Sequence, residues 1–373
     1  MTIQYLDVKT FRNLSQVQFE PDPSLNVIVG KNGSGKTSLL EAIYFLSVGK
    51  SFRTPHSHHL IQFSASQFNL FGKVVRGDTQ IPIGLEKSPG KTRIKIANDN
   101  VTSASELAMI LPVQIINPDS HKLIEEGPRF RRRFMEWGMF HVKPGYLKLW
   151  QDCRQILKQR NAALKSGWKK QDMHQWDVAL ESSANSISQA RRQYLQDLQA
   201  QVQKIAEQLK EPLLQTLQLK FRQGWPKDKT LQECLKESWA TEQKKGFTQY
   251  GPHKSDFDVL VEGTPAKQVV SRGQQKLITA ILKIAQVHHL APNSETKPVL
   301  LVDDLAAELD ADFRKLLMSF LSTQQIQVFV TAVQLDIASE LQESYPGKLF
   351  HVEHGCLTER TAELVTKKPA RIY

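Results

Sequence analysis

The spacing of apolar and polar residues changes twice along the chain and divides it into three regions. Residues 1–117 hold short runs in which apolar and polar positions alternate, which predicts β-strands joined by turns. Across 118–245 the apolar positions recur every three or four residues, as on one face of a helix. In 246–373 apolar runs alternate with helical segments. The clearest alternating runs are FNLFGKVVRG, TQIPIGLEK and KTRIKIAN.

The middle region is predicted to be a helical lobe. Its longest regular stripe lies in 187–209 and predicts a helix of about six turns. The stripe consists of Ile187, Ala190, Tyr194, Leu198, Val202, Ile205 and Leu209. We expect the preceding amphipathic segment, YLKLWQDCRQILKQRNAALKSG, to pair with this helix as a short antiparallel hairpin. Such a hairpin is far too short to be a long coiled-coil arm.

The two ends of the chain are predicted to form one α/β head. The runs PVLLV and IQVFVTAV are almost wholly apolar, which is typical of parallel strands covered on both faces. We therefore expect residues 1–117 and 246–373 to be the two parts of one head, with 118–245 as a helical insertion.

A glycine-rich loop lies between the strand-like run LNVIVG and the helix-like run TSLLEAIYFLSV. The residues of the loop are Gly30, Lys31, Asn32, Gly33, Ser34, Gly35, Lys36 and Thr37. The pattern G-x-x-x-x-G-K-T between a strand and a helix is that of a phosphate-binding loop, whose backbone N–H groups surround phosphate oxygens. Lys36 is then expected to reach the β- and γ-phosphates of a nucleotide, and the Thr37 hydroxyl to contact Mg²⁺. The competing interpretation is a chance match, which the flanking strand and helix oppose.

Two adjacent carboxylates, Asp303 and Asp304, end the run PVLLV. Ligands of parallel sheets bind at the carboxyl ends of the strands. We therefore predict that Asp303 holds Mg²⁺, mainly through water, and that Asp304 polarises the water that attacks the γ-phosphate. Because aspartate is one methylene shorter than glutamate, we expect slow hydrolysis. On the alternative interpretation, the two acids only end a strand at a surface turn.

A second helix N-terminus is expected in the sequence SRGQQK. The candidate residues are Ser271, Arg272, Gly273, Gln274 and Gln275. Free N–H groups and a small hydroxyl at the start of a helix form an anion site. Because one loop already holds the phosphates, we predict that this turn acts in trans and closes on the γ-phosphate held by Lys36 of a second copy. The alternative is an ordinary capped helix.

The charge of the chain indicates a polyanionic partner. Its 373 residues, enough for two or three domains, include 49 Lys and Arg against 38 Asp and Glu, which gives a net charge of +11. Nucleic acid is the first candidate and an anionic membrane the second. One basic run supplies Arg129, Arg131, Arg132 and Arg133. These arginines are either DNA contacts or members of a solvated or internally salt-bridged turn.

Cysteine usage and the lack of a targeting segment favour a cytoplasmic protein. Cys153, Cys234 and Cys356 are scattered, so neither a disulfide framework nor a zinc site is expected. The N-terminal residues alternate like a strand and lack the apolar core of a signal peptide. The most apolar run, AMILPVQII, is too short to span a bilayer and contains a proline.

Several motifs together resemble a known family. GKNGSGKT, SRGQQK and VDDLAAELD, in this order, resemble the ATP-binding-cassette ATPases of the SMC/Rad50 type. FRNL, LKQRNAAL, YGPHKSDF and NPDSHKLIEEGPRFRRRFMEWGMFHV narrow the resemblance to the RecF family of DNA replication and repair proteins, nearly end to end.

The resemblance implies a fold and a function. The fold is an α/β P-loop ATPase head of the ABC type with an inserted helical lobe. ATP and Mg²⁺ are the implied cofactors, and ATP drives formation of a homodimer on double- and single-stranded DNA near gaps and junctions. Weak, DNA-stimulated ATP hydrolysis then releases the DNA. RecR, and functionally RecO and RecA, are the implied partners in recombinational repair, replication recovery and the SOS response.

The sequence departs from the family pattern at three places. Ala307 stands where a serine is usual, a change that weakens an expected contact across the dimer. Lys254 and Ser255 replace the Arg and Asp of GPHRDD. No histidine follows IQVFVTAV closely, and because Thr331 and Gln334 are the nearest polar residues, we assign no histidine switch.

Three other functions compete with an ATP-gated DNA-binding protein. They are an SMC/Rad50-like DNA-end ATPase, a metabolite kinase or other P-loop transferase, and the ATPase subunit of a transporter. The SRGQ signature and the helical insertion oppose a transferase, and the basic charge and the same signature oppose a transporter subunit. Stimulation of ATP hydrolysis by duplex DNA would discriminate among them.

Overall fold

The computed structural model describes residues 2–290, 297–304, 311–324 and 326–360. The chain divides into two compact units. The head unit comprises residues 1–120 and 280–373, and the helical unit comprises 121–279. The segment 246–279, which the sequence analysis assigns to the head, lies in the helical unit, and the domain limits drawn from the sequence remain a proposal.

The head unit contains a mainly parallel sheet with the strand order β15-β14-β3-β13-β12-β8. Only the edge strand β15 is antiparallel to its neighbour among these strands. Every residue of β3, β12 and β13 is buried, which confirms the predicted sheet that is covered on both faces. The strands are β3 (Leu25–Val29), β8 (Val113–Ile116), β12 (Val299–Val302), β13 (Gln327–Ala332), β14 (Gly347–Glu353) and β15 (Cys356–Arg360).

A second, antiparallel sheet of the head unit has the order β2-β1-β4-β5-β6-β7. Buried and less buried residues alternate along β4, so one face of this sheet packs on the core and the other faces solvent. Its strands are β1 (Thr2–Phe11), β2 (Leu14–Phe19), β4 (Phe68–Arg76), β5 (Thr79–Ser88), β6 (Lys91–Ile96) and β7 (Asp99–Val101).

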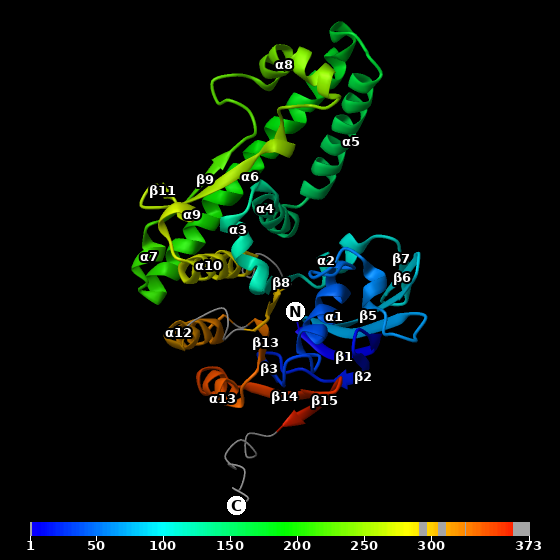
Figure 1. The fold of residues 1–373 in the computed structure, drawn as a ribbon, viewed down its shortest axis with the longest axis vertical. Helices are drawn as coiled ribbons and strands as arrows, with labels where there is room; N and C mark the ends of the chain where they lie inside the picture. Colours follow the sequence, from blue (N-terminus) through cyan, green and yellow to red (C-terminus); the bar gives the residue numbers. More distant parts are fainter. Residues whose placement is uncertain (1, 291–296, 305–310, 325, 361–373) are drawn as a thin grey trace, which may run out of the picture. The chain divides into compact units, whose positions relative to one another are not determined.

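Helices complete the layers of the head unit. α1 (Lys36–Val48) contacts strands of both sheets, and Figure 1 shows α12 and α13 on the opposite side of the parallel sheet. The rings of Phe11, Phe45 and Phe68 pack edge to face within the core between α1 and the antiparallel sheet. The other elements are η1 (Ser57–Leu60), α2 (Ala104–Ile110), η2 (Pro118–His121), α12 (Ala311–Ser322) and α13 (Leu335–Ser344).

The helical unit combines helices with a three-stranded antiparallel sheet of order β11-β10-β9. Its strands are β9 (Leu217–Arg222), β10 (Asp256–Val261) and β11 (Thr264–Pro265). The longer helices are α4 (Pro128–Val142), α5 (Tyr146–Lys165), α6 (His174–Leu209) and α8 (Leu231–Lys245), and the unit also contains the start of α10 (Arg272–Leu290), whose residues from 280 onward belong to the head unit. Shorter elements are α3 (Lys122–Glu125), η3 (Lys170–Met173), α7 (Pro212–Gln215), η4 (Pro252–Lys254) and α9 (Ala266–Val269).

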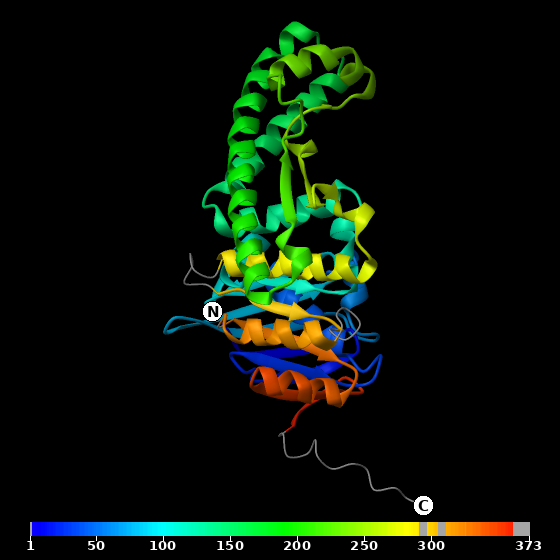
Figure 2. The ribbon, with the colours of Figure 1, turned by 90° about the vertical axis from the view of Figure 1, so that its left-hand side faces the viewer.

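The central helix of this unit, α6, is longer than its apolar stripe predicts. It has 36 residues and starts at His174, whereas the apolar stripe predicts a start at 187. Leu180 and Ala184 are fully buried and extend the stripe toward the N-terminus. Figure 2 shows α6 as one continuous helix, and it packs against α5 as the predicted hairpin requires.

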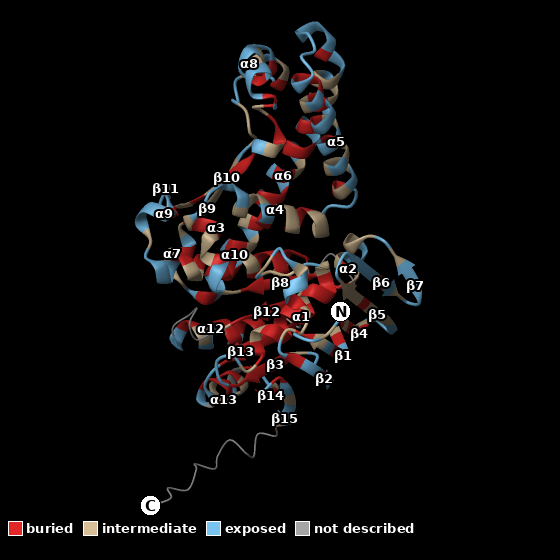
Figure 3. Cartoon of the chain, turned by 45° about the vertical axis from the view of Figure 1, so that its right-hand side comes forward, coloured by how far each residue is buried: buried red, intermediate tan, exposed pale blue. Residues whose placement is uncertain are grey.

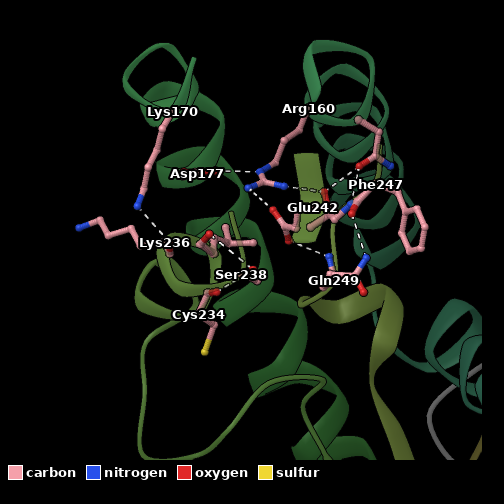
Figure 4. A network of polar contacts seen from close by, with 12 residues as sticks. Arg160, Lys170, Asp177, Cys234, Lys236, Ser238, Glu242, Phe247 and Gln249 are labelled. Atoms are coloured by element: carbon pink, nitrogen blue, oxygen red, sulfur yellow. Dashed lines mark hydrogen bonds and ion pairs between the residues drawn. The ribbon is translucent and has the colours of Figure 1, made fainter. Parts of the chain in front are cut away.

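A buried ion-pair network joins α5, α6, α8 and the segment after α8 (Figure 4). The fully buried guanidinium of Arg160 donates from Nε to Asp177 Oδ1 at 2.8 Å and from Nη1 to Thr248 Oγ1 at 2.8 Å. Its Nη2 lies 2.8 Å from Oε2 of Glu242, which is also fully buried. The other oxygen of Glu242 accepts a bond of 2.7 Å from the backbone N–H of Gln249. We name these residues the Arg160 network.

Acid is expected to weaken the helical unit through His141. The ring packs against Trp137 and Phe140, and burial lowers the pKa of His141 to about 4. A histidine in the unfolded chain has a pKa near ~6.5. Between pH ~6.5 and 4 the unfolded chain therefore binds a proton at His141, whereas the folded chain does not. The stabilisation is therefore complete above pH ~6.5 and falls by up to about 3 kcal/mol as the pH approaches 4.

His141→Phe, which keeps an aromatic ring, tests this expectation. All six tryptophans lie within 121–279, so tryptophan fluorescence follows denaturant unfolding of the helical unit. The wild type should lose more stability between pH ~6.5 and 4 than the variant does. Equal losses in the two proteins would show that this histidine carries no proton-linked stability.

Candidate functional site

An open pocket of about 590 Å³ lies in the head unit. Its size falls within the usual range of about 300–1,000 Å³ for small-molecule sites. The glycine-rich loop contributes Asn32, Gly33, Gly35, Lys36 and Thr37 to its wall. The end of β12 contributes Asp303 and Asp304, so the fold brings the predicted loop and the predicted carboxylates together.

The loop conformation requires glycine at two positions. Gly30 and Gly35 both have positive φ, at 159° and 121°. A Cβ atom on Gly30 would lie 2.3 Å from the carbonyl oxygen of Val352, and one on Gly35 would lie 2.8 Å from Leu14 Cδ2. At Gly30 the neighbouring backbone leaves no room for a side chain, and at Gly35 the positive φ itself favours glycine. α1 starts directly after this loop at Lys36. The first N–H groups of such a helix have no intrahelical partner and point toward the pocket end.

Neighbouring segments hold the loop in place. Asn13 Nδ2 donates to the carbonyl oxygen of Gly33 at 3.1 Å, and the N–H of Gly355 donates to that of Ser34 at 3.0 Å. The hydroxyl of Ser34 is buried and has no hydrogen-bond partner within the described parts of the chain. A buried polar group of this kind is usually satisfied by a ligand or by ordered water.

The ammonium group of Lys36 is fixed within the loop. Nζ donates to the carbonyl oxygens of Gly30 and Lys31 at 2.6 and 3.0 Å, and the residue is only 8% exposed. Burial lowers the pKa of Lys36, while Asp304 and Asp303 act in the opposite direction. The loop thus presents a desolvated cation, whose attraction to an anion is stronger than in water.

Thr37 and Asp303 form an oxygen-rich corner of the pocket. The hydroxyls of Thr37 and Thr331 both donate to Asp303 Oδ1, at 3.0 and 2.8 Å. Burial raises the pKa of Asp303, and the bonds from the two hydroxyls lower it. A carboxylate and a hydroxyl, completed by water and phosphate oxygens, are ligands that Mg²⁺ accepts, so these residues fit that ion.

Asp304 lies in the same pocket with an unusual backbone. Its φ is 55°, in the left-handed region that aspartate tolerates better than most residues. The N–H of Asp304 donates to Thr331 Oγ1 at 2.8 Å. Thr331 therefore positions both acids.

Further residues line the pocket that the sequence motifs did not assign to a nucleotide site, although Thr331 and the FRNL motif were noted for other reasons. They are Arg12, Asn13, Ser38, Arg53, His59, Ile61, Phe63, Thr331 and Val333. Glu41 of α1, which is fully buried, accepts bonds of 3.0 and 2.9 Å from Arg12 and lies 3.5 Å from Arg53. Together with Lys36 the pocket therefore has three cations. The motif FRNL contains Arg12, but its distance in sequence from the loop hides the contact.

The turn Ser271 to Gln275 belongs to the helical unit and caps α10. The N–H of Gln274 donates to Ser271 Oγ at 3.3 Å, and the N–H of Ser271 donates to Gln274 Oε1 at 2.8 Å. These two bonds form a capping box. Within one chain the turn therefore acts as an ordinary helix cap, which is the alternative stated from the sequence. The side chain of Arg272 is 93% exposed and lies 4.0 Å from Glu125.

The arginine run of α4 divides into two kinds of residue. Arg131 donates to both carboxylate oxygens of Asp256, at 2.9 and 2.8 Å, which matches the internal salt bridge foreseen as one alternative. Arg132 donates to the carbonyl oxygen of Ser255 at 3.3 Å. Arg129 and Arg133 are exposed and remain candidates for DNA contact.

Three further expectations concern residues outside this pocket. Ala307 lies outside the described residues. Within the described ranges, no group of three or more His, Cys, Asp and Glu side chains is arranged to hold a metal ion. In the same ranges, every helix is too short or too polar to cross a membrane.

Comparisons with known proteins bear on the whole chain. Residues 2–358 match the family described as RecF/RecN/SMC N terminal domain. DNA replication and repair protein RecF of Shewanella halifaxensis is 38% identical over 372 residues, which cover 100% of both chains. The protein of the same name from Vibrio vulnificus is 38% identical over 363 residues, or 96% of this chain and 100% of the relative.

Solved structures agree with this similarity. The recombination mediator protein RecF bound to ATP, from the RecFOR pathway, is 26% identical with a TM-score of 0.83, and covers 96% of this chain and 99% of its own. An Smc head bound to the C-terminal winged-helix domain of ScpA is 15% identical with a TM-score of 0.60, and covers 99% and 100%. The second similarity concerns the fold alone, an ABC-type ATPase head.

Proposed function

The chain belongs to the RecF/RecN/SMC N-terminal domain family, and from this membership we propose that it is an ATP-gated DNA-binding protein of DNA repair and replication recovery. The observation that carries the proposal is the meeting of Lys36, Thr37, Asp303 and Asp304 in one pocket. A solved relative of the same fold is bound to ATP.

We assign the phosphate end of the site to the loop Gly30 to Thr37. Lys36 faces the β- and γ-phosphates, and the N–H groups at the start of α1 face phosphate oxygens. Arg12 and Arg53, oriented by Glu41, add positive charge to the wall. The positive side of the pocket faces the phosphates of a nucleotide, and the carboxylates of Asp303 and Asp304 at the end of β12 suit the accompanying cation.

Thr37 and Asp303 are the residues that would hold Mg²⁺. When bound, the ion neutralises charge on the phosphates during phosphoryl transfer. Asp304 is the residue that orients and deprotonates the attacking water. The short aspartate side chain makes this base inefficient, so hydrolysis is slow and serves to end the DNA-bound state.

The turn Ser271 to Gln275 completes the site in trans. Its capping box is closed within one chain, but the exposed Ser271 hydroxyl and the start of α10 are available to a γ-phosphate. We propose that two copies each supply this turn to the nucleotide held by the other, so ATP binding and dimerisation are linked.

DNA binding is assigned mainly to the helical unit. Residues 121–279 contain 28 Lys and Arg and 17 Asp and Glu, whereas the rest of the chain contains 21 of each. The entire positive excess of the chain therefore lies in this unit. Contacts from Arg129, Arg133 and other exposed cations to phosphates would be sequence-blind and would weaken steeply with salt.

The cellular setting follows from the family and is part of the proposal. Dimers would form at gaps and junctions between single- and double-stranded DNA and would help RecR and RecO to load RecA, which links the protein to recombination and the SOS response. The cysteines Cys153, Cys234 and Cys356 are free, which suits a reducing cytoplasm.

Asp304→Asn is expected to bind ATP and to remain dimeric. The amide keeps the size of the side chain but cannot accept the proton of the attacking water, so hydrolysis should fall by about 10²–10⁴-fold. Analytical sedimentation with ATP and duplex DNA measures the dimer, and phosphate release measures hydrolysis. Asp312→Asn, at an exposed position of α12, is the matched control and should behave as the wild type. A monomeric Asp304→Asn protein in saturating ATP would contradict the shared-nucleotide arrangement.

A further inference from the structure

The solvent-facing side of the antiparallel sheet in the head unit has an unusual composition. Leu70, Ile83 and Ile94 point into the core from three neighbouring strands, so the alternate residues form the opposite face. Figure 3 shows that β6 and β7 at this side are largely exposed. We name this side the outer face. Its central members are Tyr5, Phe71, Lys73, Pro82, Gly84 and Lys95.

The register of the strands places an aromatic ring of β4 beside small residues of β5. Phe71 of β4 lies opposite Gly84 of β5, which in turn lies opposite Lys95 of β6. In the next row, Lys73 lies opposite Pro82. Because Gly84 has no side chain and Pro82 a short one, the centre of β5 forms a flat strip between a row from β4 and a row from β6.

Two aromatic rings stand at the edge of this strip. The rings of Tyr5 and Phe71 pack edge to face with their centroids 6.2 Å apart, and both residues are only partly buried. The ammonium group of Lys73 lies 5.7 Å from the centroid of the Tyr5 ring. Partly exposed rings next to cations are the combination on which unpaired bases stack in single-strand binding proteins.

The charge of the outer face is positive although the head unit is neutral. Its cations are Lys9, Lys73, Lys91, Arg93 and Lys95, and its acids are Asp7 and Glu86. Each acid is already engaged: Lys9 lies 3.4 Å from Asp7, and Arg93 lies 2.9 Å from Glu86. The remaining cations flank the flat strip on both sides, which is complementary to a phosphate backbone.

We propose that the outer face binds single-stranded DNA, with bases stacked on Phe71 and Tyr5 and phosphates along the lysines of β4 and β6. The rows of β4 and β6 are two strand spacings, or about 10 Å, apart. The bases of a B-form duplex are paired and stacked inside the helix, so they cannot stack on these rings as unpaired bases can. The inference rests on the proposed DNA-binding function and adds a surface for the unpaired strand, separate from the basic helical unit.

Binding of fluorescein-labelled oligo(dT), followed by anisotropy, tests the proposal. Phe71→Leu keeps an apolar side chain but loses the ring, and should weaken binding about 5- to 100-fold. Lys95→Glu, at an exposed position, should weaken binding and make the salt slope shallower by about 0.7 for each phosphate that the variant no longer neutralises. Lys315→Glu on α12 is the matched control of equal charge change and should bind as the wild type.

A second measurement keeps the proposal testable if a variant folds poorly. Oligonucleotides that contain 5-iodouracil should photocrosslink to Tyr5 or Phe71 in the wild-type chain. Unchanged oligo(dT) affinity in both variants, or an effect of Lys95→Glu alone, would overturn stacking on this face. So would a wild-type chain that does not bind oligo(dT). The proposed function is judged separately, because ATP-dependent dimerisation and duplex binding should persist in both variants.

Discussion

Lys36→Met is expected to abolish ATP binding and, with it, ATP-dependent dimerisation. The ammonium group is buried and held toward the pocket by the carbonyl oxygens of Gly30 and Lys31. Removal of one partner from a buried charge pair costs about 2–5 kcal/mol, which corresponds to a rise in Kd of at least about thirtyfold. Methionine has a similar length, so the loop and α1 should keep their conformation.

Calorimetric titration with ATP and sedimentation with and without ATP measure the two effects. Lys50→Met is the matched control, because this side chain is exposed just after α1 and does not line the pocket. The control should bind ATP and dimerise as the wild type does. If Lys36→Met dimerises with ATP at wild-type concentrations, the assignment of this loop as the nucleotide site is wrong.

Arg160→Met is expected to destabilise the helical unit by about 3–5 kcal/mol. The change leaves the fully buried carboxylate of Glu242 without its ion-pair partner and removes the bonds to Asp177 and Thr248. A single buried charge without compensation is among the most costly defects in a protein interior. Denaturant unfolding followed by tryptophan fluorescence, which reports on this unit alone, measures the loss.

A double variant separates the charge defect from packing. In Arg160→Met with Glu242→Met both charges are absent, so much of the stability should return. Lys148→Met, on the same helix, breaks an exposed pair with Asp152 and should cost no more than about 0.5 kcal/mol. The loss of unfolding free energy in the double variant is compared with the sum of the losses in the two single variants. If the loss in the double variant is larger than that sum, the Arg160 network acts through packing rather than charge.

The glycine-rich loop of the head unit can be recognised from sequence alone, whereas the Arg160 network of the helical unit can be recognised only in the structure. The loop around Lys36 is one continuous segment of the sequence, and it contains the glycines that its backbone conformation needs. The Arg160 network joins residues up to 88 positions apart, between Arg160 and Thr248. No local pattern distinguishes Arg160 from the exposed cations of the same basic lobe.

Local rules also explain the expectations that need revision. The predicted helix begins at 187 because the residues just before it are mostly polar. In the structure, Leu180 and Ala184 continue the buried face of α6 toward its N-terminus. The choice between the two alternatives stated for Arg131 also needed the structure, because its position on α4 places it against Asp256 of β10. Burial of one face of a helix depends on the neighbouring element, which composition does not reveal.

The sequence by itself determined the α/β class, the buried parallel strands, the glycine-rich loop before α1 and the pair of acids at the end of β12. These features are encoded by neighbours within a few residues, where steric and hydrogen-bond rules act directly. Only the tertiary structure decided that Glu41 directs Arg12 and Arg53 into the pocket, that Thr331 holds both acids, and that rings and lysines share the outer face. Those contacts depend on strand order and register, which arise when the whole core packs and not from any one segment.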